Sequence, residues 1–404
     1  MAEPTISAAV ALPTNADARR PLRAATGALT TTIAVSIPVF LVGGLAVQIG
    51  DELGFSPAGL GLAVSAYFGA SALASVPAGV LVERYGSTLI SRSAIALAAA
   101  SLLGIAAGAR SLWSLVAILA LGAAANALGQ LASNSSLAMR VPPRRQGLSF
   151  GVKQAAIPVC TLLAGAAVPA VALTLGWRWA FVLAALLGLA AIPLVPADEK
   201  RARRAHTRNR NQATGALVVL GVAATLAAGA ANTLGTFLVD SAAARGISPG
   251  PAGLTLTLGG AVCVFARITG GWQADRFPAR QVGVIAGVLA AGAFGLALLA
   301  VPGTVALVIG VLLGFGLGWA WPGLMNFAVV RLHPQAPAAA TSITQTGVYA
   351  GGCLGPLGLG ALASIAGYPT MWVLAAVAML SAAGLMIVGS TMLRRHPATA
   401  AAVR

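Results

Sequence analysis

Two cations stand inside long apolar stretches of the chain, Lys153 and Arg267. A charged side chain at hydrocarbon depth is costly, so a cation in such a stretch marks a functional site by default. No Asp or Glu stands in the middle of any apolar stretch. The two cations therefore predict a positively charged site that suits an anionic or acidic solute. The alternative is structural: Lys153 extends its amine toward the nearer headgroups, and Arg267 supports the loop that follows its helix.

A stripe of carboxamides is the second feature. Asn126, Gln130 and Asn134 recur at every fourth residue, and a helical face drifts by only about 40° over each such step. Facing lipid, these amides would leave donors and acceptors unsatisfied in hydrocarbon. The stripe is therefore predicted to face a cavity that holds water or a solute, and the alternative is hydrogen bonding between helices.

The sequence carries no signature of catalysis or of metal binding. It contains no HExxH or GxSxG segment, no Walker phosphate loop and no Cys/His metal spacing. Its histidines all fall in segments predicted to be cytoplasmic: His206, His333 and His396. We therefore expect no catalytic residue, no metal ligand and no cofactor, and neither an enzyme nor an ATP-driven pump.

Membrane helices must position these polar residues. Of the 404 residues, 58% are hydrophobic and only 8% are charged, whereas about a quarter are charged in soluble proteins. The apolar stretches are too long for the strands of an outer-membrane barrel. At about 20 apolar residues a span, we predict an all-α polytopic membrane protein with twelve transmembrane helices, at residues 24–49, 57–82, 88–109, 112–138, 147–174, 178–196, 214–240, 250–274, 280–301, 303–330, 338–366 and 369–393.

Topology explains the net charge of +16. With the amino terminus inside, all but three of the 25 Lys and Arg residues fall on the cytoplasmic side or in the cytoplasmic halves of helices, the exceptions being Arg110, Arg178 and Arg245. This is the positive-inside bias, so no nucleic-acid partner is needed. We expect an integral protein of the cytoplasmic (inner) membrane with both termini cytoplasmic. The cations of residues 198–212 anchor this topology or grip anionic lipid headgroups.

The chain repeats itself after about 190 residues. Gly54–Pro57 reappears 192 residues later as Gly246–Pro249, and Gln154 and Gln345 are 191 residues apart. Such a repeat indicates a secondary transporter built from two halves. We predict an N-terminal six-helix bundle and a C-terminal one, joined by a basic cytoplasmic linker and flanked by two cytoplasmic tails, at residues 24–196, 214–393, 197–213, 1–23 and 394–404.

A short charged hinge follows the second helix of each half. The first copy reads GVLVERYGSTLISR from Gly79 to Arg92, and the second reads GWQADRFPAR from Gly271 to Arg280. In each copy a glycine allows close helix packing, and an acid followed by an arginine ends the helix at the aqueous boundary. The predicted gating residues are Gly79, Glu83, Arg84, Gly86, Gly271, Asp275 and Arg276. The alternative is a tight charged loop without a gating role.

The twelve helices with these hinges resemble the major facilitator superfamily of transporters over residues 24–393. In that family the hinge runs G-x-L-x-D-R-x-G-R-[KR]. The first copy matches it at Gly79, Leu81, Arg84 and Gly86, has Glu83 as the acid, and has Ser87 and Thr88 in place of the basic pair. The resemblance implies a cytoplasmic latch that holds the halves together in the outward-open state. The segments GVKQAAIP (151–158) and GWRWAF (176–181) look broadly like the cyanate-transporter-like branch.

The resemblance also implies that helices one, four, seven and ten line a central cavity. The predicted substrate-binding residues are Asn126, Gln130, Asn134, Lys153, Gln154, Asn232, Thr236, Arg267, Trp319, Asn326 and Gln345. We predict a monomeric secondary active transporter, surrounded by membrane lipids, that moves a small anionic organic solute by alternating access, with protons as a candidate coupling ion. The alternatives are efflux of amphipathic drugs by the same fold and a non-transporting membrane sensor.

Overall fold

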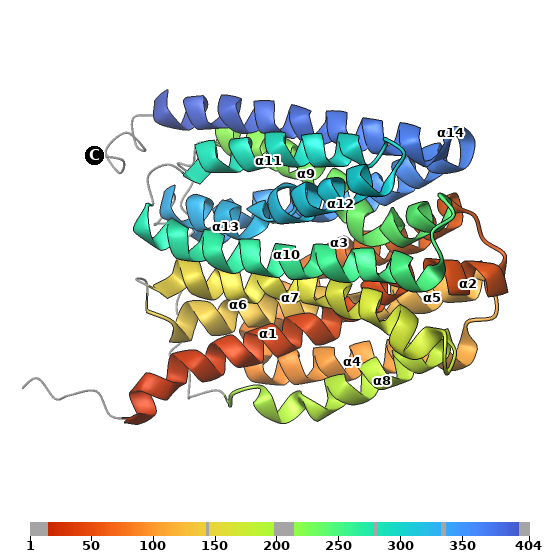
Figure 1. The fold of residues 1–404 in the computed structure, drawn as a ribbon. Coiled ribbons are helices and arrows are strands. Elements are labelled where there is room, and N and C mark those ends of the chain that lie inside the picture. The colour runs from red at the N-terminus through yellow and green to blue at the C-terminus, as the bar shows by residue number, and fades with distance from the viewer. Residues whose placement is uncertain (1–14, 143–144, 198–213, 278–280, 333–336, 396–404) are drawn as a thin grey trace, which may run out of the picture.

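The chain forms a bundle of long helices. The computed structural model describes residues 15–142, 145–197, 214–277, 281–332 and 337–395. These ranges contain helices and no strand, which confirms the predicted all-α class. The helices run roughly side by side along one direction (Figure 1). Their bounds are α1 Asn15–Gly44, α2 Ala46–Leu53, α3 Pro57–Tyr85, α4 Ser87–Gly108, α5 Leu112–Gly122, α6 Ala124–Arg140, α7 Gln146–Ala167, α8 Trp177–Ala190, α9 Thr214–Ala243, α10 Pro249–Arg276, α11 Gln281–Leu298, α12 Thr304–Leu313, α13 Trp321–Leu332 and α14 Pro337–Arg395.

The number of spans agrees with the prediction. Ten helical segments of the described chain are long and apolar enough to cross a membrane. One of them, Thr344–Leu393, is a hairpin, because Gly367 within α14 has φ 78° and ψ 166° and turns the chain back (Figure 1). The other nine spans, the two legs of α14 and the shorter apolar helix Val282–Leu298 give the twelve membrane helices expected. The protein is therefore a polytopic membrane protein.

Some boundaries differ from those predicted. Helix α1 begins at Asn15 rather than at residue 24, because NADARRPLR contains good helix formers but no apolar run. The fourth and tenth spans are each broken, into α5 and α6 and into α12 and α13. Residues 1–14 and 396–404 of the predicted tails and residues 198–213 of the predicted linker lie outside the described residues, as do His206, His333 and His396.

The backbone repeats in the same way as the sequence. Gly54 and Gly246, 192 residues apart, have φ of 67° and 83°, and Gly176 and Gly367, 191 residues apart, have φ of 95° and 78°. Only glycine enters this left-handed region at little cost, because it has no Cβ. The chain thus makes equivalent turns at equivalent places in its two halves.

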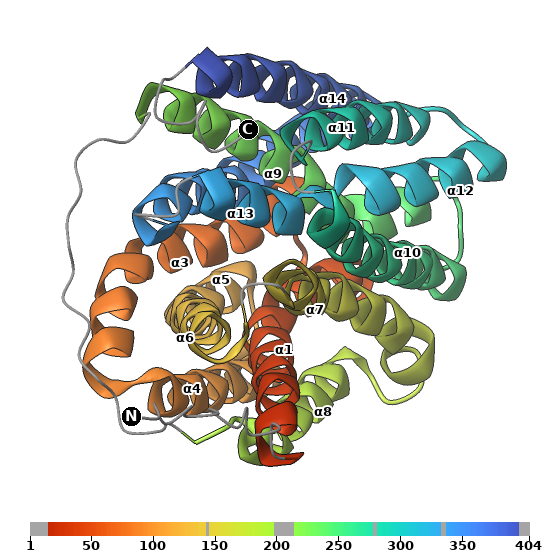
Figure 2. The ribbon, with the colours of Figure 1, turned by 90° about the vertical axis from the view of Figure 1, so that its left-hand side faces the viewer.

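The two halves contact each other through closely packed backbone atoms. A Cβ added to Gly43 of α1 would lie 2.4 Å from the Gly235 carbonyl oxygen of α9, and one on Gly61 of α3 would lie 2.2 Å from that of Pro356 in α14. Helix α7 lies along α10 in the same way (Figure 2). Small residues allow membrane helices to approach this closely. The joints between the halves therefore consist of close backbone contacts.

Helix α1 begins and α14 ends at the same end of the bundle (Figure 1). This end is called the terminal side, and the opposite end is called the far side. On the far side Glu52 of α2 forms an ion pair with Arg178 of α8 at 2.6 Å and accepts a hydrogen bond from the Trp177 indole at 2.7 Å. The Arg178 hydrogen bond, followed by that of Trp177, lowers the pKa of Glu52. In the second half, Tyr368 donates to the Asp240 carboxylate at the corresponding place.

Candidate substrate cavity

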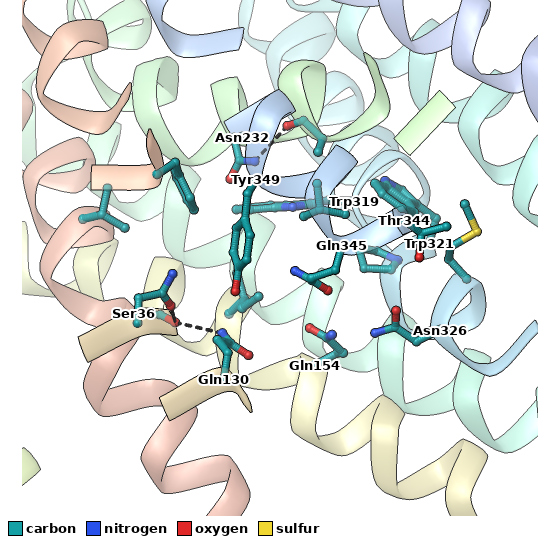
Figure 3. A pocket seen from close by; sticks show the side chains of 18 of the residues that line it. Ser36, Gln130, Gln154, Asn232, Trp319, Trp321, Asn326, Thr344, Gln345 and Tyr349 are labelled. Atoms are coloured by element: carbon teal, nitrogen blue, oxygen red, sulfur yellow. Dashed lines mark hydrogen bonds between the residues drawn. The ribbon is translucent and has the colours of Figure 1, made fainter. Parts of the chain in front are cut away.

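A cavity of about 70 Å³ lies between the two halves (Figure 3). Because one water needs roughly 10–15 Å³ of such space, the cavity holds a few waters or a small solute. The first half contributes lining residues from α1, α3, α6 and α7, and the second half contributes them from α9, α10, α13, α14 and the segment before α13. Neither half completes the cavity alone.

Eight of the eleven predicted substrate-binding residues line this cavity: Asn126, Gln130, Gln154, Asn232, Arg267, Trp319, Asn326 and Gln345. The other three do not. Thr236 donates to the Asn232 carbonyl oxygen of its own helix at 2.8 Å. Asn134 ends the amide stripe, where the drift of the helical face has taken it off the cavity, and its Oδ1 is buried without a hydrogen-bond partner. Lys153 lies behind Gln130, to which it donates.

Arg267 of α10 bridges the halves from within the cavity wall. Its side chain is only 2% exposed. Its Nε and Nη2 donate to the Trp319 carbonyl oxygen at 3.0 and 2.7 Å, and its Nη1 donates to the Gln154 carbonyl oxygen at 2.5 Å. The Gln154 carbonyl is available because Pro158, four residues later, has no N–H to complete the helical bond. The Trp319 carbonyl is available because the helix is broken there, between a π-helical turn at Gly314–Gly318 and α13.

The cavity therefore carries an uncompensated positive charge. Within the described part of the chain no carboxylate forms an ion pair with Arg267, and no acidic residue lines the cavity. Backbone carbonyls engage three of the five N–H donors of this guanidinium. Trp321 adds a further donor, because its indole Nε1 is buried without a partner. Such a donor set suits a solute that presents hydrogen-bond acceptors.

A chain of hydrogen-bonded side chains crosses the first half. Lys153 Nζ donates to Gln130 Oε1 at 2.5 Å. Gln130 Nε2 in turn donates to Ser36 Oγ at 3.5 Å, and Figure 3 shows this second bond. Ser36 Oγ donates to Asn126 Oδ1 at 3.5 Å, and Asn126 Nδ2 donates to Ser71 Oγ at 3.2 Å. The chain links α7, α6, α1 and α3, and its members Gln130, Ser36 and Asn126 line the cavity.

Sequence reasoning missed most of the aromatic lining. Six aromatic side chains line the cavity: Phe40, Tyr67, Phe68, Trp319, Trp321 and Tyr349. Of these, Trp319 was among the predicted binding residues. The spacing of Tyr349 four residues after Gln345 places both on one helical face and could have indicated it. The rings of Phe40 and Trp319, from different halves, have centroids 5.8 Å apart.

A family model decides the identity of the fold. The model described as Major Facilitator Superfamily matches residues 26–356 and again residues 220–403. The chain belongs to the Major Facilitator Superfamily. Its fold is therefore that of a membrane transporter.

A solved structure shares this superfamily fold over nearly the whole chain. It is that of a bacterial homologue of the human lysosomal transporter Spinster, in an inward-facing and occupied conformation. The similarity has a TM-score of 0.68 at 15% sequence identity, and it covers 95% of this chain and 97% of that one. At this identity the similarity shows the fold alone. No curated protein matches the sequence.

In this member of the superfamily, the second hinge joins the halves on the terminal side. The Asp275 carboxylate at the end of α10 accepts hydrogen bonds from the backbone N–H groups of Gly147 and Leu148, at 3.1 and 3.0 Å. These are the second and third residues of α7, so Asp275 caps that helix and its charge complements the helix dipole. A Cβ on Gly271 would lie 3.2 Å from the Gly151 Cα. The Arg276 guanidinium lies over the Trp272 ring of the same helix, 3.7 Å from its centroid.

The first hinge has different surroundings. Gly86, with φ 87°, turns the chain from α3 into α4. Glu83 and Arg84 are exposed, and the Arg84 guanidinium lies over the Tyr85 ring at 5.3 Å. No described atom lies within 4 Å of a Cβ built on Gly79, in contrast to its counterpart Gly271. The first glycine of the motif is therefore closely packed in the second half and uncrowded in the first.

Proposed function

We propose that this transporter carries a small anionic organic solute across the membrane by alternating access. The observation that carries the proposal is Arg267, a buried cation in the cavity wall that forms no ion pair with a carboxylate of the described residues. An uncompensated cation at membrane depth is costly, and an anion in the cavity would offset that cost.

The neutral lining supports the same solute class. Amide side chains from both halves surround the cation, including the repeat partners Gln154 and Gln345. Carboxamides and the Trp321 N–H donate to oxygen acceptors, and a carboxylate offers several acceptor positions. Aromatic faces such as those of Trp319 and Tyr349 suit the carbon skeleton of an organic anion. The small volume of the cavity favours a solute of few atoms.

Contacts between the halves at both ends of the bundle support alternating access. On the far side α3 packs against α14, and the Ala58 N–H donates to Ser364 Oγ at 2.9 Å. The terminal side is joined at the Asp275 cap. We propose that the terminal side is cytoplasmic in the inner membrane, as the positive-inside bias indicates, and that the halves rock about the cavity. One chain completes the cavity, so a monomer suffices.

A second candidate function is efflux of amphipathic drugs. Its support is the aromatic lining, which is richer than the sequence indicated. Aromatic faces bind organic cations as well as apolar rings. A cationic drug, however, would have to approach the buried cation Arg267, which would repel it. No carboxylate among the lining residues would balance the charge of the drug.

Ligand-induced thermal stabilisation of the purified protein tests the proposal. The panel is acetate, lactate, malonate, succinate, nitrate, cyanate, an organic cation and a lipophilic drug, and the variants are wild type, R267K and R267Q. The matched control is R245Q, because Arg245 also donates to backbone carbonyls, of Val301 and Leu299, but does not line the cavity.

The proposal expects anions to stabilise wild type and R245Q, R267K to respond weakly, and R267Q not to respond. Stabilisation by the cation or the drug, equal in wild type and R267Q, would reject the anion site and support efflux. A neutral Gln retains some hydrogen bonding to the two carbonyls, so R267Q separates loss of charge from loss of the fold.

A further inference from the structure

Lys153 has no role in the cavity described above, although its surroundings are unusual. Its side chain is 1% exposed, and among the described residues its Nζ donates to one partner, Gln130 Oε1. An ammonium group has three N–H donors. No carboxylate of the described residues forms an ion pair with it. Holding a charge here is costly, because burial removes the amine from bulk water and no described counter-charge pairs with it.

The elements packed against α7 offer little to balance that charge. They are α1, α6, α10 and α13, together with the π-helical turn that follows α7. Their titratable or charged side chains, together with those of α7 itself besides Lys153, are Arg23, Arg140, Cys160, Cys263, Arg267, Asp275 and Arg276 among the side chains that the structure describes. The one acid in this set, Asp275, is engaged at Gly147 and Leu148, more than a helical turn before Lys153.

Gln130 connects this amine to the cavity. Its Oε1 accepts from Lys153, its Nε2 donates to Ser36, and its side chain lines the cavity. A solute that binds beside Gln130 therefore lies next to the one hydrogen-bond partner that the amine has within the described part of the chain. An anion there would stabilise the ammonium form by Coulomb attraction, which is strong in a low-dielectric interior.

We propose that Lys153 is the proton-coupling group of this transporter, which makes it an anion–proton symporter; the proposal rests on the anion transport proposed above. A hydronium ion in the cavity water gives its proton to the nitrogen lone pair of the neutral amine as an anion enters. One O–H bond breaks, one N–H bond forms and a neutral water is left. The halves then rock. When the anion leaves, the N–H bond breaks and the proton passes to water on the other side.

This cycle moves one proton with one monovalent anion and no net charge. Anion and proton favour each other's binding by the same factor, because such coupling is reciprocal. The scheme needs no carboxylate in the transport path. It also explains why a buried lysine lies one side chain away from the cavity rather than in contact with the solute.

The test uses the full-length protein in proteoliposomes with acetate, lactate, nitrate and cyanate as solutes. Exchange of labelled against unlabelled solute without a pH gradient reports binding and rocking. Net accumulation driven by about one pH unit reports coupling, and symport of one proton with a monovalent anion sustains about tenfold accumulation. The variants are K153M and K153Q, and the control is T161V, which removes another buried hydrogen bond from α7.

We expect K153M and K153Q to exchange within about twofold of wild type and T161V, while their accumulation falls to no excess over the outside concentration. Loss of exchange together with accumulation would make Lys153 a binding residue and overturn the proposal. Full accumulation by K153M would also overturn it. Absence of exchange of all four solutes by wild type would reject the proposed anion transport itself, and the coupling role with it.

A measurement without solute covers the case in which the variants insert poorly. The melting temperature of wild type, K153Q and T161V is followed from pH 5 to pH 9, a range that spans the physiological values. A group that gains or loses a proton on unfolding gives a pH-dependent stability. We expect the difference between wild type and K153Q to change with pH and that between wild type and T161V to stay constant. A constant difference for K153Q would overturn the proposal.

Discussion

Removal of the Asp275 carboxylate should open the terminal-side joint between α7 and α10. The carboxylate accepts two backbone hydrogen bonds at the start of α7. Loss of a helix cap costs about 1 kcal/mol, and loss of a favourable charge at a helix amino terminus costs a further 0.3–1 kcal/mol, roughly. D275A should therefore cost about 1.3–2 kcal/mol, which corresponds to a roughly nine- to thirtyfold larger open population. D275N keeps one acceptor oxygen and loses the charge, so about two- to fivefold is expected.

The assay is labelling of a cysteine placed in the joint. Ala274 is 1% exposed and precedes Asp275, so A274C in a background with Cys160, Cys263 and Cys353 replaced by alanine reacts only when the joint opens. A membrane-impermeant maleimide is added from the terminal side in inside-out vesicles. Gln273 is exposed in the same turn, and Q273A is the control. Equal labelling rates for D275A, Q273A and the parent would refute the role of the cap.

Three further predictions concern other parts of the structure. G271A should lower the melting temperature, because a Cβ at Gly271 would lie 2.9 Å from a backbone oxygen. G79A should leave the melting temperature unchanged, because no described atom lies within 4 Å of a Cβ at Gly79. Equal melting temperatures of the two variants would contradict this. W321F should stabilise the empty protein by about 1 kcal/mol, because it removes a buried donor without an acceptor. The same substitution should weaken binding of the stabilising anion about fivefold, as measured by calorimetry. Unchanged binding would show that the indole N–H does not contact the solute. Because Arg178 lowers the pKa of Glu52 in the folded state, the stabilisation from this pair should be present above the ordinary glutamate pKa of about 4.3 and disappear as the pH falls below it. Thermal unfolding of wild type and E52Q at neutral and acidic pH measures this stabilisation. A difference in melting temperature between the two that persists at acidic pH would contradict it.

The fold could be predicted from the sequence because each pattern that indicates it is local or recurs at a fixed spacing along the chain. Apolar length defines the spans, and glycines such as Gly54 and Gly246 mark equivalent turns at a fixed offset. Boundaries failed where a helix extends beyond the apolar run, as at Asn15, because helix propensity rather than hydropathy decides there.

The site was predictable only to the level of residue type. Arg267 is conspicuous as a cation in an apolar span. Its hydrogen-bond acceptors, however, are the Gln154 carbonyl, which a proline leaves without a helical partner, and the Trp319 carbonyl, which lies at a helix break in the other half. These depend on how the halves meet, which no local pattern encodes. Trp321 escaped notice because nothing in its sequence neighbourhood distinguishes a cavity tryptophan from a core one. Lys153 was detected, but its position behind Gln130 depends on side-chain directions that spacing alone does not give.

The backbone contacts between the halves have a consequence for how the substrate range of such a chain changes in evolution. At Gly43 with Gly235, and at Gly61 with Pro356, the contact surfaces are made of backbone atoms that every residue shares. Substitutions among the cavity side chains leave those surfaces untouched. New solutes could therefore be acquired by changing the lining while the proposed rocking motion is inherited unaltered, and the glycines at the joints are the positions at which drift is least tolerated.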